Sequence, residues 1–496
     1  MIDIFMNLMG GFEAALTLTN ILFIALGIAL GIVIGVIPGL GSVTAIAVLV
    51  PVTYYMSPVV AIAFLVGVNK GGTSGGAVPS ILLNTPGTPE SAASAFDGYP
   101  MAKKGQGEKA MKFALYSSVT GDTLSDALLI LLAAPFAAFA LQFGPLELAS
   151  VLLFAFALLS GLSSNSPLKG MIAIFVGIFL ATIGLDPIDS TPRMVFDQVD
   201  LYDGLPLTAL AIGALALASV LEQITSMHRY GDDHAAVADV KGDAAANHLS
   251  AREFFSHWRT IIRSAMIGSG VGMLPGLGVT LAAFLSYGAA RRASKHPETF
   301  GTGNPEGIIA TEAANSAVVG SNLIPTIAIG IPGNIAAALL IGAFMIHGIV
   351  PGPFMLTMHG DIIYALFASM LIANGIHLLV GKLGIRIWAL IARAPRTAVL
   401  PPVILFCLVG VYLPGQSTFE VGIMLAFAVL GMLMRYTGFS IVCLVIGFLL
   451  GEMFETSLRQ SLLLYKADLS AVLSSPIAVV FLALSAIILV RAGRKV

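Results

Sequence analysis

Residues 69–87 read NKGGTSGGAVPSILLNTPG, and residues 315–333 read NSAVVGSNLIPTIAIGIPG. The two stretches lie 246 positions apart, and at that offset the opening asparagines, a central proline and the closing Pro-Gly pairs coincide. A second motif precedes each stretch, because residues 35–41 read GVIPGLG and residues 272–278 read GMLPGLG. Two motifs that recur in the same order indicate an internal duplication of the chain.

The composition is that of a polytopic membrane protein. Of 496 residues, 57% are hydrophobic and only 10% are Asp, Glu, Lys or Arg, against about 25% charged residues in soluble domains. No charged residue occurs from Ala14 to Asn69, so this stretch fits the bilayer. The net charge of −2 gives no basic surface for nucleic acid. Both cysteines, Cys407 and Cys443, lie in apolar runs and are interpreted as small hydrophobic residues.

We expect an all-α fold of two inverted-topology repeats with re-entrant hairpins and broken helices. At about 20 residues per crossing, about 11–12 transmembrane segments fit the chain. The expected units are a first transmembrane repeat at 1–225, a cytoplasmic linker loop with an amphipathic helix at 226–262, a second repeat at 263–470, and an extra C-terminal transmembrane helix with a basic tail at 471–496.

Charge bias predicts the orientation, because Lys and Arg near span ends mark the cytoplasmic side. Basic loops at 101–112, 226–263, 289–300 and 381–396 are therefore expected inside, as is the carboxyl end. The loop 186–204 carries five Asp and one Arg and is expected outside. The amino terminus is placed outside as well.

The PGLG motifs are the predicted tips of re-entrant hairpins. Arg263 and Arg291 are both predicted inside, and PGLG divides the apolar stretch between them into two pieces. Each piece has about 11 residues and reaches only half of a roughly 30 Å hydrocarbon core. The first PGLG lacks basic flanks, so its hairpin would enter from outside and the repeats would be inverted. The alternative is one ordinary span kinked at Pro275.

The repeated polar stretches are the predicted binding site. Polar, glycine-rich backbone at membrane depth is tolerated only when it is buried in protein or lines a cavity. We expect Gly and Pro to break the helix there, so that carbonyl and hydroxyl groups ligate Na⁺ and restarting helix N-termini hold a carboxylate. The alternative is a glycine-rich packing seam. The candidate substrate-binding residues are Asn69, Lys70, Gly71, Gly72, Thr73, Ser74, Asn84, Thr85, Pro86, Gly87, Asn315, Ser316, Ser321, Asn322, Pro332, Gly333 and Asn334.

The coupling ion is expected to be Na⁺ or H⁺, with no other cofactor and no transition-metal site. Lys70 either pairs with a substrate carboxylate or snorkels to the interface. Asp122 and Glu312 either relay a proton or are helix-end carboxylates in contact with water. The coupling-ion candidates are Pro38, Gly39, Gly41, Pro275, Gly276, Gly278, Asp122 and Glu312.

Two other function classes remain open at this point. Residues 72–75 read GTSG and match the G-x-S-G form of rhomboid-type intramembrane proteases, with Ser74 as nucleophile and His377 as the intramembrane candidate for the base that such a serine needs. An ion or solute channel is the second alternative. Interrupted segments at corresponding positions of two halves favour alternating access over a continuous pore.

The same motifs carry a family resemblance over about residues 14–490. The run from GVIPGLG through NKGGTSGGAVPSILLNTPGTPESAASAFDGYPMAKKGQGEKA, together with GMLPGLG, ATEAANSA and NLIPTIAIGIPG, resembles the large membrane subunit of tripartite tricarboxylate transporters, the TctA family. The resemblance implies a multi-pass protein of the bacterial inner membrane. It implies secondary uptake of carboxylates such as citrate, with a small membrane subunit and a periplasmic solute-binding protein as partners. No P-loop motif for ATP is present in the sequence.

Overall fold

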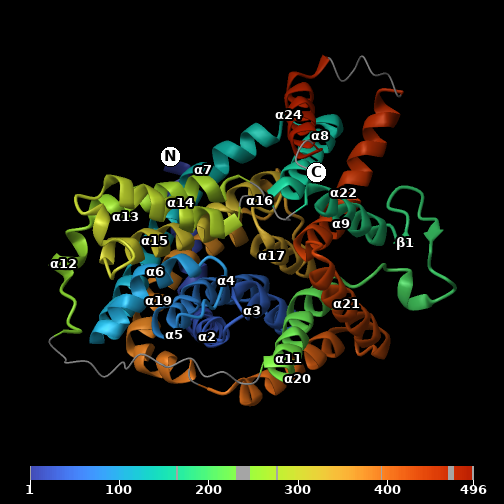
Figure 1. The fold of residues 1–496 in the computed structure, drawn as a ribbon. Helices are drawn as coiled ribbons and strands as arrows, with labels where there is room; N and C mark the ends of the chain where they lie inside the picture. The colour runs from blue at the N-terminus through green and yellow to red at the C-terminus, as the bar shows by residue number, and fades with distance from the viewer. Residues whose placement is uncertain are drawn as a thin grey trace.

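The computed structural model describes residues 2–162, 166–230, 246–274, 278–392, 394–466 and 474–493. These residues are overwhelmingly helical (Figure 1), as the sequence predicts. The helices of the first half are α1 (Ile2–Ala15), α2 (Leu18–Gly35), α3 (Ser42–Leu49), α4 (Pro58–Gly75), α5 (Ala77–Leu83), α6 (Ala92–Met101), α7 (Gly107–Ala140), α8 (Pro145–Leu162), α9 (Pro167–Ala181), α10 (Leu207–Ala211) and α11 (Ala218–Tyr230).

The second half begins after the linker and ends in an additional helix. Its helices are α12 (Ala251–Phe255), α13 (Trp258–Gly272), α14 (Gly278–Ala293), α15 (Pro305–Ser321), α16 (Leu323–Ile329), α17 (Ile335–Ile346), α18 (Met355–Met358), α19 (Gly360–Ile391), α20 (Arg396–Gly415), α21 (Thr418–Thr437), α22 (Ile441–Leu464) and α24 (Pro476–Gly493). Two-residue strands β1 (Gly184–Leu185) and β2 (Pro192–Arg193) pair in the loop after α9.

The two halves carry the same local break in their helices. Helices α5 and α16 each end at a residue in the left-handed region, Asn84 at φ 55° and Gly330 at φ 82°. The N–H groups of Thr85 and Ile331 then donate to the carbonyls of Pro79 and Pro325, both at 3.3 Å. Each pair is separated by the same 246 positions that separate the sequence motifs. The duplicated sequence therefore forms duplicated local structure.

The helices before the breaks also pack in the same way. A Cβ atom on Gly31 of α2 would overlap the carbonyl oxygen of Val68 in α4, and one on Gly268 of α13 would overlap that of Ala314 in α15. Small residues permit this close approach of membrane helices. The close α2–α4 and α13–α15 seams thus require glycine at matching positions.

The repeats interlock through their longest helices. Helix α7 of the first half packs along α15 of the second, while α19 of the second packs along α2 and α4 of the first. The C-terminal helices α22 and α24 lie beside α9 and α8 (Figure 1). Polar groups on α7 and α19 are therefore placed against the opposite repeat.

The predicted helix break lies only in the second part of each repeated stretch. Residues from Asn69 to Gly75 continue α4, and residues from Asn315 to Ser321 continue α15. A Cβ on Gly71 would overlap the carbonyl of Ile28, so close packing explains this glycine. The chain leaves the helical path only after α5 and α16, at residues 84–91 and 330–334. The packing seam considered from the sequence accounts for the first part of the stretch.

The amphipathic helix predicted within the linker at 226–262 is also interrupted. Helix α12 ends at Phe255, and α13 starts at Trp258 and continues into the apolar region. Helix α11 continues to Tyr230, past the predicted start of the linker.

The described chain is an all-α polytopic membrane protein. Within it, seven helices are long and apolar enough to cross a membrane, and five more apolar helices are shorter. Helix α19 exposes large apolar side chains along one face, as lipid contact requires: Leu379, Leu383, Ile387 and Leu390. The total of 11–12 crossings, the inverted orientation and the hairpins stay predictions. Pro275 and Gly276 lie outside the described residues.

Candidate functional site: a cavity between the two helix breaks

A cavity of about 760 Å³ lies between the two helix breaks, and Gly39, Gly41 and Gly278 also line it. It brings together part of the predicted set from both repeats: Gly39, Gly41, Asn69, Thr73, Gly87, Gly278, Gly333 and Asn334. A space of this size is typical of small-molecule sites. The structure therefore assembles one cavity from the segments that the sequence repeats.

Four helices begin at residues that line this cavity. Helix α3 follows Gly41, α14 begins at Gly278, α17 follows Asn334, and α22 follows Ser440. Asn334 and Ser440 accept hydrogen bonds from the N–H groups of Ala337 and Cys443 and so cap their helices. Helix N-termini carry partial positive charge and free N–H groups, which favour anions. The cavity wall is thus suited to a carboxylate.

Arg435 is a cationic group in the cavity wall that the sequence analysis did not select. It lies in the last turn of α21, and its Nη1 is 2.6 Å from Oε2 of Glu222. Its Nη2 donates to Ser219 Oγ. Arg435 is the single Lys or Arg between Arg396 and Arg459. An isolated basic residue in an otherwise uncharged apolar stretch is a candidate for function, so the sequence does carry a signal for Arg435.

Two carboxylates accompany this guanidinium. Glu222 is more than half exposed, and Glu90 lines the cavity beside the first break. Because the two carboxylates outnumber Arg435, the side chains lining the cavity are net negative when all are ionised. An anionic ligand would therefore bind more readily together with a cation.

The remaining predicted substrate-binding residues lie outside the cavity wall. Asn84 and Pro86 are exposed in the turn of the first break, and Thr85 lies between them. Asn322 is buried, and neither side-chain polar atom has a hydrogen-bond partner among the described residues. The other members of this group are largely or fully buried in the helices or beside the second break: Lys70, Gly71, Gly72, Ser74, Asn315, Ser316, Ser321 and Pro332.

Lys70 is fully buried in a network of side chains from three helices. Its Nζ is 2.9 Å from Oδ2 of Asp126 and 3.4 Å from Oδ1 of Asp122, both on α7. Its Nζ also donates to Oδ1 of Asn374 on α19 at 2.8 Å, and the Asn374 amide donates to Asp126. The chain therefore supplies its own carboxylates to this ammonium group.

Glu312 lies apart from the Lys70 network in a pocket of serines. Its two carboxyl oxygens accept hydrogen bonds from Ser94 on α6 and Ser118 on α7. The side chain is fully buried on α15. Glu312 therefore joins the two repeats through hydroxyl groups and, among the described residues, has no ion pair.

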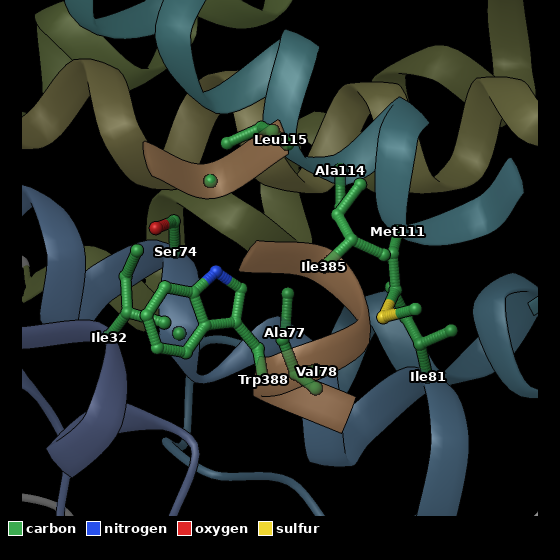
Figure 2. A pocket seen from close by; sticks show the side chains of 12 residues that line it. Ile32, Ser74, Ala77, Val78, Ile81, Met111, Ala114, Leu115, Ile385 and Trp388 are labelled. Atoms are coloured by element: carbon green, nitrogen blue, oxygen red, sulfur yellow. The ribbon is translucent and has the colours of Figure 1, made fainter. Parts of the chain in front are cut away.

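Ser74 and His377 do come together, as the protease alternative requires. Ser74 Oγ is 2.7 Å from Nε2 of His377, and Asp122 Oδ2 is 3.9 Å from Nδ1. However, Ser74 lies within the last turn of α4, where helical backbone N–H groups are already bonded, so they cannot bind an oxyanion. The adjoining pocket, with a volume of about 30 Å³ (Figure 2), has room for little more than one water molecule. The geometry does not favour peptide hydrolysis.

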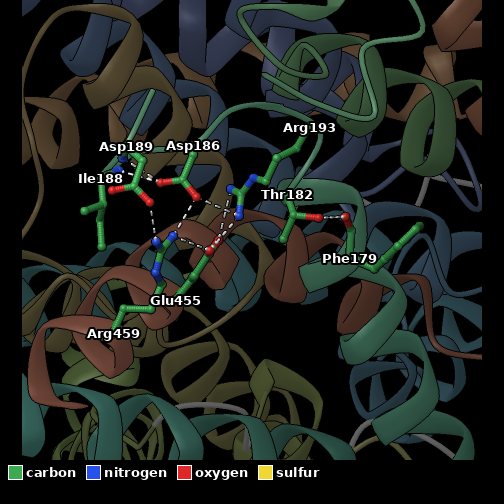
Figure 3. A network of polar contacts seen from close by, with 8 residues as sticks. All are labelled: Phe179, Thr182, Asp186, Ile188, Asp189, Arg193, Glu455 and Arg459. Carbon is green, nitrogen blue, oxygen red and sulfur yellow. Dashed lines mark hydrogen bonds and ion pairs between the residues drawn. The ribbon is translucent and has the colours of Figure 1, made fainter. Parts of the chain in front are cut away.

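A charged network closes the acidic loop that is predicted to lie outside (Figure 3). Asp186 Oδ1 accepts from the N–H groups of Ile188 and Asp189, and Oδ2 is 2.6 Å from Nη1 of Arg459. These hydrogen bonds hold the pKa of Asp186 well below its ordinary value. Arg193 and Glu455 complete the network at 2.6 Å. The loop is thereby tied to α22.

The sequence matches the tripartite tricarboxylate transporter TctA family over residues 21–446. It is 33% identical over 483 residues to an uncharacterized 52.8 kDa protein in the TAR-I ttuC' 3' region of Agrobacterium vitis, covering 97% of this chain and 95% of that protein. A protein in the TAR-II ttuC' 3' region of the same organism is 32% identical over 225 residues, covering 45% of this chain and 93% of that protein. No solved structure matches the chain.

Proposed function

The chain belongs to the TctA family of tripartite tricarboxylate transporters, and we propose that it is the large membrane subunit that imports di- or tricarboxylates such as citrate. Transport would be secondary and driven by a gradient of Na⁺ or H⁺. The observation that carries the proposal is the cavity between the two helix breaks.

The wall of this cavity provides the chemistry for a carboxylate. Four helix N-termini and the Arg435 guanidinium offer N–H donors and positive charge at separate points of one space. A di- or tricarboxylate has several carboxylate groups and can use more than one of these points at once. Arginine binds a carboxylate with two parallel hydrogen bonds. The exposed Glu222, which holds the guanidinium, would yield it to the substrate.

Cation coupling follows from the charges around the substrate. Glu90 and Glu222 line the same cavity as Arg435, so a carboxylate entering alone would increase the net negative charge. A Na⁺ ion at the helix breaks or a proton on a carboxyl group would offset that charge. Symport of substrate and cation is therefore the proposed mode of transport.

The proposed movement is alternating access, in an elevator-like form. The two helix breaks would move as one body, because the α2–α4 and α13–α15 seams are close within each repeat and α4 also contacts α15 of the opposite repeat. One part of the cavity wall adjoins segments that charge bias predicts to be cytoplasmic. This part contains Glu222, Arg435 and Ser440. The structure would then represent a state whose cavity approaches that side.

Family membership supports the partners that the sequence resemblance implies. We propose that the chain works in a bacterial inner membrane with a small membrane subunit, and that a periplasmic solute-binding protein delivers the carboxylate. The acidic loop joined to α22 by the Asp186–Arg459 pair is on the side predicted to face that protein.

Uptake of labelled citrate into proteoliposomes with all three components tests the proposal. One set would carry an imposed Na⁺ gradient and another a proton gradient. Accumulation above the external concentration under one gradient is the expected result. Movement that only equilibrates citrate would indicate a channel. If neither citrate nor any carboxylate retained by the binding protein moves, the transporter proposal is wrong.

A further inference from the structure

We propose that Asp122 carries a transferable proton and that His377 and Ser74 connect it to the small pocket beside Trp388. This inference rests on the proposed function and names H⁺ as its coupling ion. It begins with the two carboxyl groups beside Lys70, because these two groups are held very differently.

Asp126 is the counter-ion of Lys70. Its Oδ2 accepts hydrogen bonds from Lys70 Nζ at 2.9 Å and from the Asn374 amide at 2.8 Å. Asn374 in turn accepts from Lys70 through its own carbonyl oxygen. Lysine, aspartate and asparagine thus form a closed triangle, and the charge of Lys70 is neutralised within it.

Asp122 is the second carboxyl group, and it has no such partner. Its Oδ1 is 3.4 Å from Lys70 Nζ, and no described residue completes a hydrogen bond to either of its oxygens. The side chain is buried as completely as that of Asp126. One ammonium beside two carboxylates leaves one negative charge in a site without water contact. Such a charge is strongly disfavoured unless a proton or a cation neutralises it.

A proton fits Asp122 better than Na⁺ does. Hard cations select oxygen ligands, whereas Asp122 faces the Lys70 ammonium and the His377 imidazole. The other charged or titratable groups near this site are Asp126 on the same helix and Glu312 on α15, which is bonded to Ser118 one turn before Asp122. The ammonium would repel a bound Na⁺, but it would tolerate a neutral carboxylic acid.

His377 is placed to exchange this proton. Ser74 Oγ lies 3.2 Å from the carbonyl of Gly71 and 2.7 Å from Nε2 of His377. When the Ser74 hydroxyl donates to that carbonyl, Nε2–H is the donor to Ser74 Oγ. That tautomer leaves Nδ1 as an acceptor facing Asp122 Oδ2 at 3.9 Å, and Nδ1 has no hydrogen-bond partner among the described residues. A small side-chain movement would let the Asp122 O–H donate to Nδ1.

The relay reaches water through Ser74. Ser74 lines the pocket of about 30 Å³, whose other lining residues come from α2, α4, α5, α7 and α19 and include Trp388 (Figure 2). The same end of α7 and α19 carries Glu108, Lys112 and Arg386, in the segments predicted to be cytoplasmic. When Nδ1 accepts the Asp122 proton, Nε2 gives its proton to Ser74 Oγ, and the Ser74 hydroxyl, turned from the Gly71 carbonyl into the pocket, gives its own proton to a water molecule there. His377 is then neutral again, with its proton on Nδ1.

Infrared spectroscopy of the full chain in lipid nanodiscs tests where the proton is. A protonated carboxyl group has a C=O band separate from those of carboxylates and amides. With ¹³C in the Asp carboxyl groups of the wild-type chain, we expect part of this band to shift at neutral pH, because Asp122 is protonated. Any unshifted part would come from protonated Glu side chains. If no part of the band shifts, Asp122 is ionised and the proposal is wrong.

Variants assign the band and test the relay. Asp122→Asn should remove the shifted component, whereas Glu312→Gln should leave it in place. His377→Gln should keep the component but move it, because the proton acceptor has changed. If Asp122→Asn leaves the component unchanged, the proton is elsewhere. The labelled wild-type chain gives the answer even where a variant fails to fold.

Transport separates this inference from the proposed function. In proteoliposomes, Asp122→Asn should lose accumulation driven by a proton gradient and retain exchange of external for internal citrate. Wild-type chain that exchanges no carboxylate would contradict the proposed function without affecting the infrared result. Accumulation by Asp122→Asn at the wild-type level would overturn Asp122 as the coupling site.

Discussion

Asn84 and Gly330 occupy the same left-handed conformation at the ends of α5 and α16, at φ 55° and 82°. They lie 246 positions apart, and each directs the chain from a broken helix into the cavity region. Asparagine and glycine are the residues that adopt this conformation most readily. The helix breaks of the two repeats are therefore specified by the local sequence.

This conformation gives a direct test of the breaks. Asn84→Val should destabilise the chain by about 1–2 kcal/mol, because a β-branched residue is strained in the left-handed region. Asn84→Gly should be tolerated, since glycine adopts a positive φ without strain. Thermal unfolding in detergent, with membrane level as a second readout, compares the two variants. Equal melting temperatures would mean that the turn is not rigid.

The packing seams predict a contrast between two glycines of one helix. Gly268→Ala should impair folding and uptake, because its methyl group would overlap the Ala314 carbonyl. Gly270→Ala, with open space around the added atom, should be neutral or stabilise by about 0.5–1 kcal/mol. The yield of monodisperse protein measures the effect of each substitution. Similar losses for the two variants would contradict the close α13–α15 contact.

The first asparagine of each repeated stretch is predicted to be essential for transport. Asn69→Ala and Asn315→Ala should each abolish uptake while leaving membrane insertion intact. Asn69 lines the cavity, whereas Asn315 is buried in α15 and its side-chain amide has no hydrogen-bond partner among the described residues. The first loss would therefore arise at the cavity wall and the second within the packed helices. Uptake assays at matched protein levels measure this. Normal uptake in both variants would show that the two repeated stretches are not required for transport.

The acidic outer loop should loosen at low pH. The pKa of Asp186 is lowered by two backbone N–H groups and Arg459, so its ionised form stabilises the folded loop. That contribution is complete above the ordinary value of 3.8 and is lost as pH falls toward the lowered pKa. Hydrogen exchange of residues 184–206, corrected for the intrinsic rate, should rise as pH falls from about 5 to about 3.

Substitution at neutral pH provides the matched comparison. Asp186→Asn should already show the faster exchange at pH 7, because the neutral amide holds Arg459 and Arg193 less strongly. Asp197→Asn changes an exposed carboxylate of the same loop and should have no effect. If both variants exchange at the wild-type rate, the network in Figure 3 does not hold the loop.

Much of the fold follows from the sequence because the repeated motifs mark its breaks. The membrane class, the duplication and the family could all be predicted from long runs of residues. The part of each stretch that stays helical could not be predicted, because Gly71 and Gly72 serve close helix packing and only the partner helix shows this. A glycine-rich segment can have the same composition whether it packs closely against another helix or forms a turn, so composition alone does not distinguish the two.

The site was predicted in part for a similar reason. Asp122 and Asp126 share a helix face by their spacing, but their contact with Lys70 depends on how α4 packs against α7. Arg435 lies in no repeated motif, so the duplicated polar stretches do not predict it. Its place in the site depends on α21 and α22 bordering the cavity.

Arg435→Gln gives the most direct test of the central claim that carboxylates bind in the cavity between the two helix breaks. Uptake of the carboxylate retained by the partner binding protein would be measured in proteoliposomes, with Arg386→Gln as the control because that side chain is 84% exposed. Removing one charge-assisted pair should raise the half-saturating concentration at least about tenfold, equivalent to about 1.4 kcal/mol, while Arg386→Gln behaves as wild type. Wild-type kinetics for Arg435→Gln would contradict a carboxylate site in this cavity.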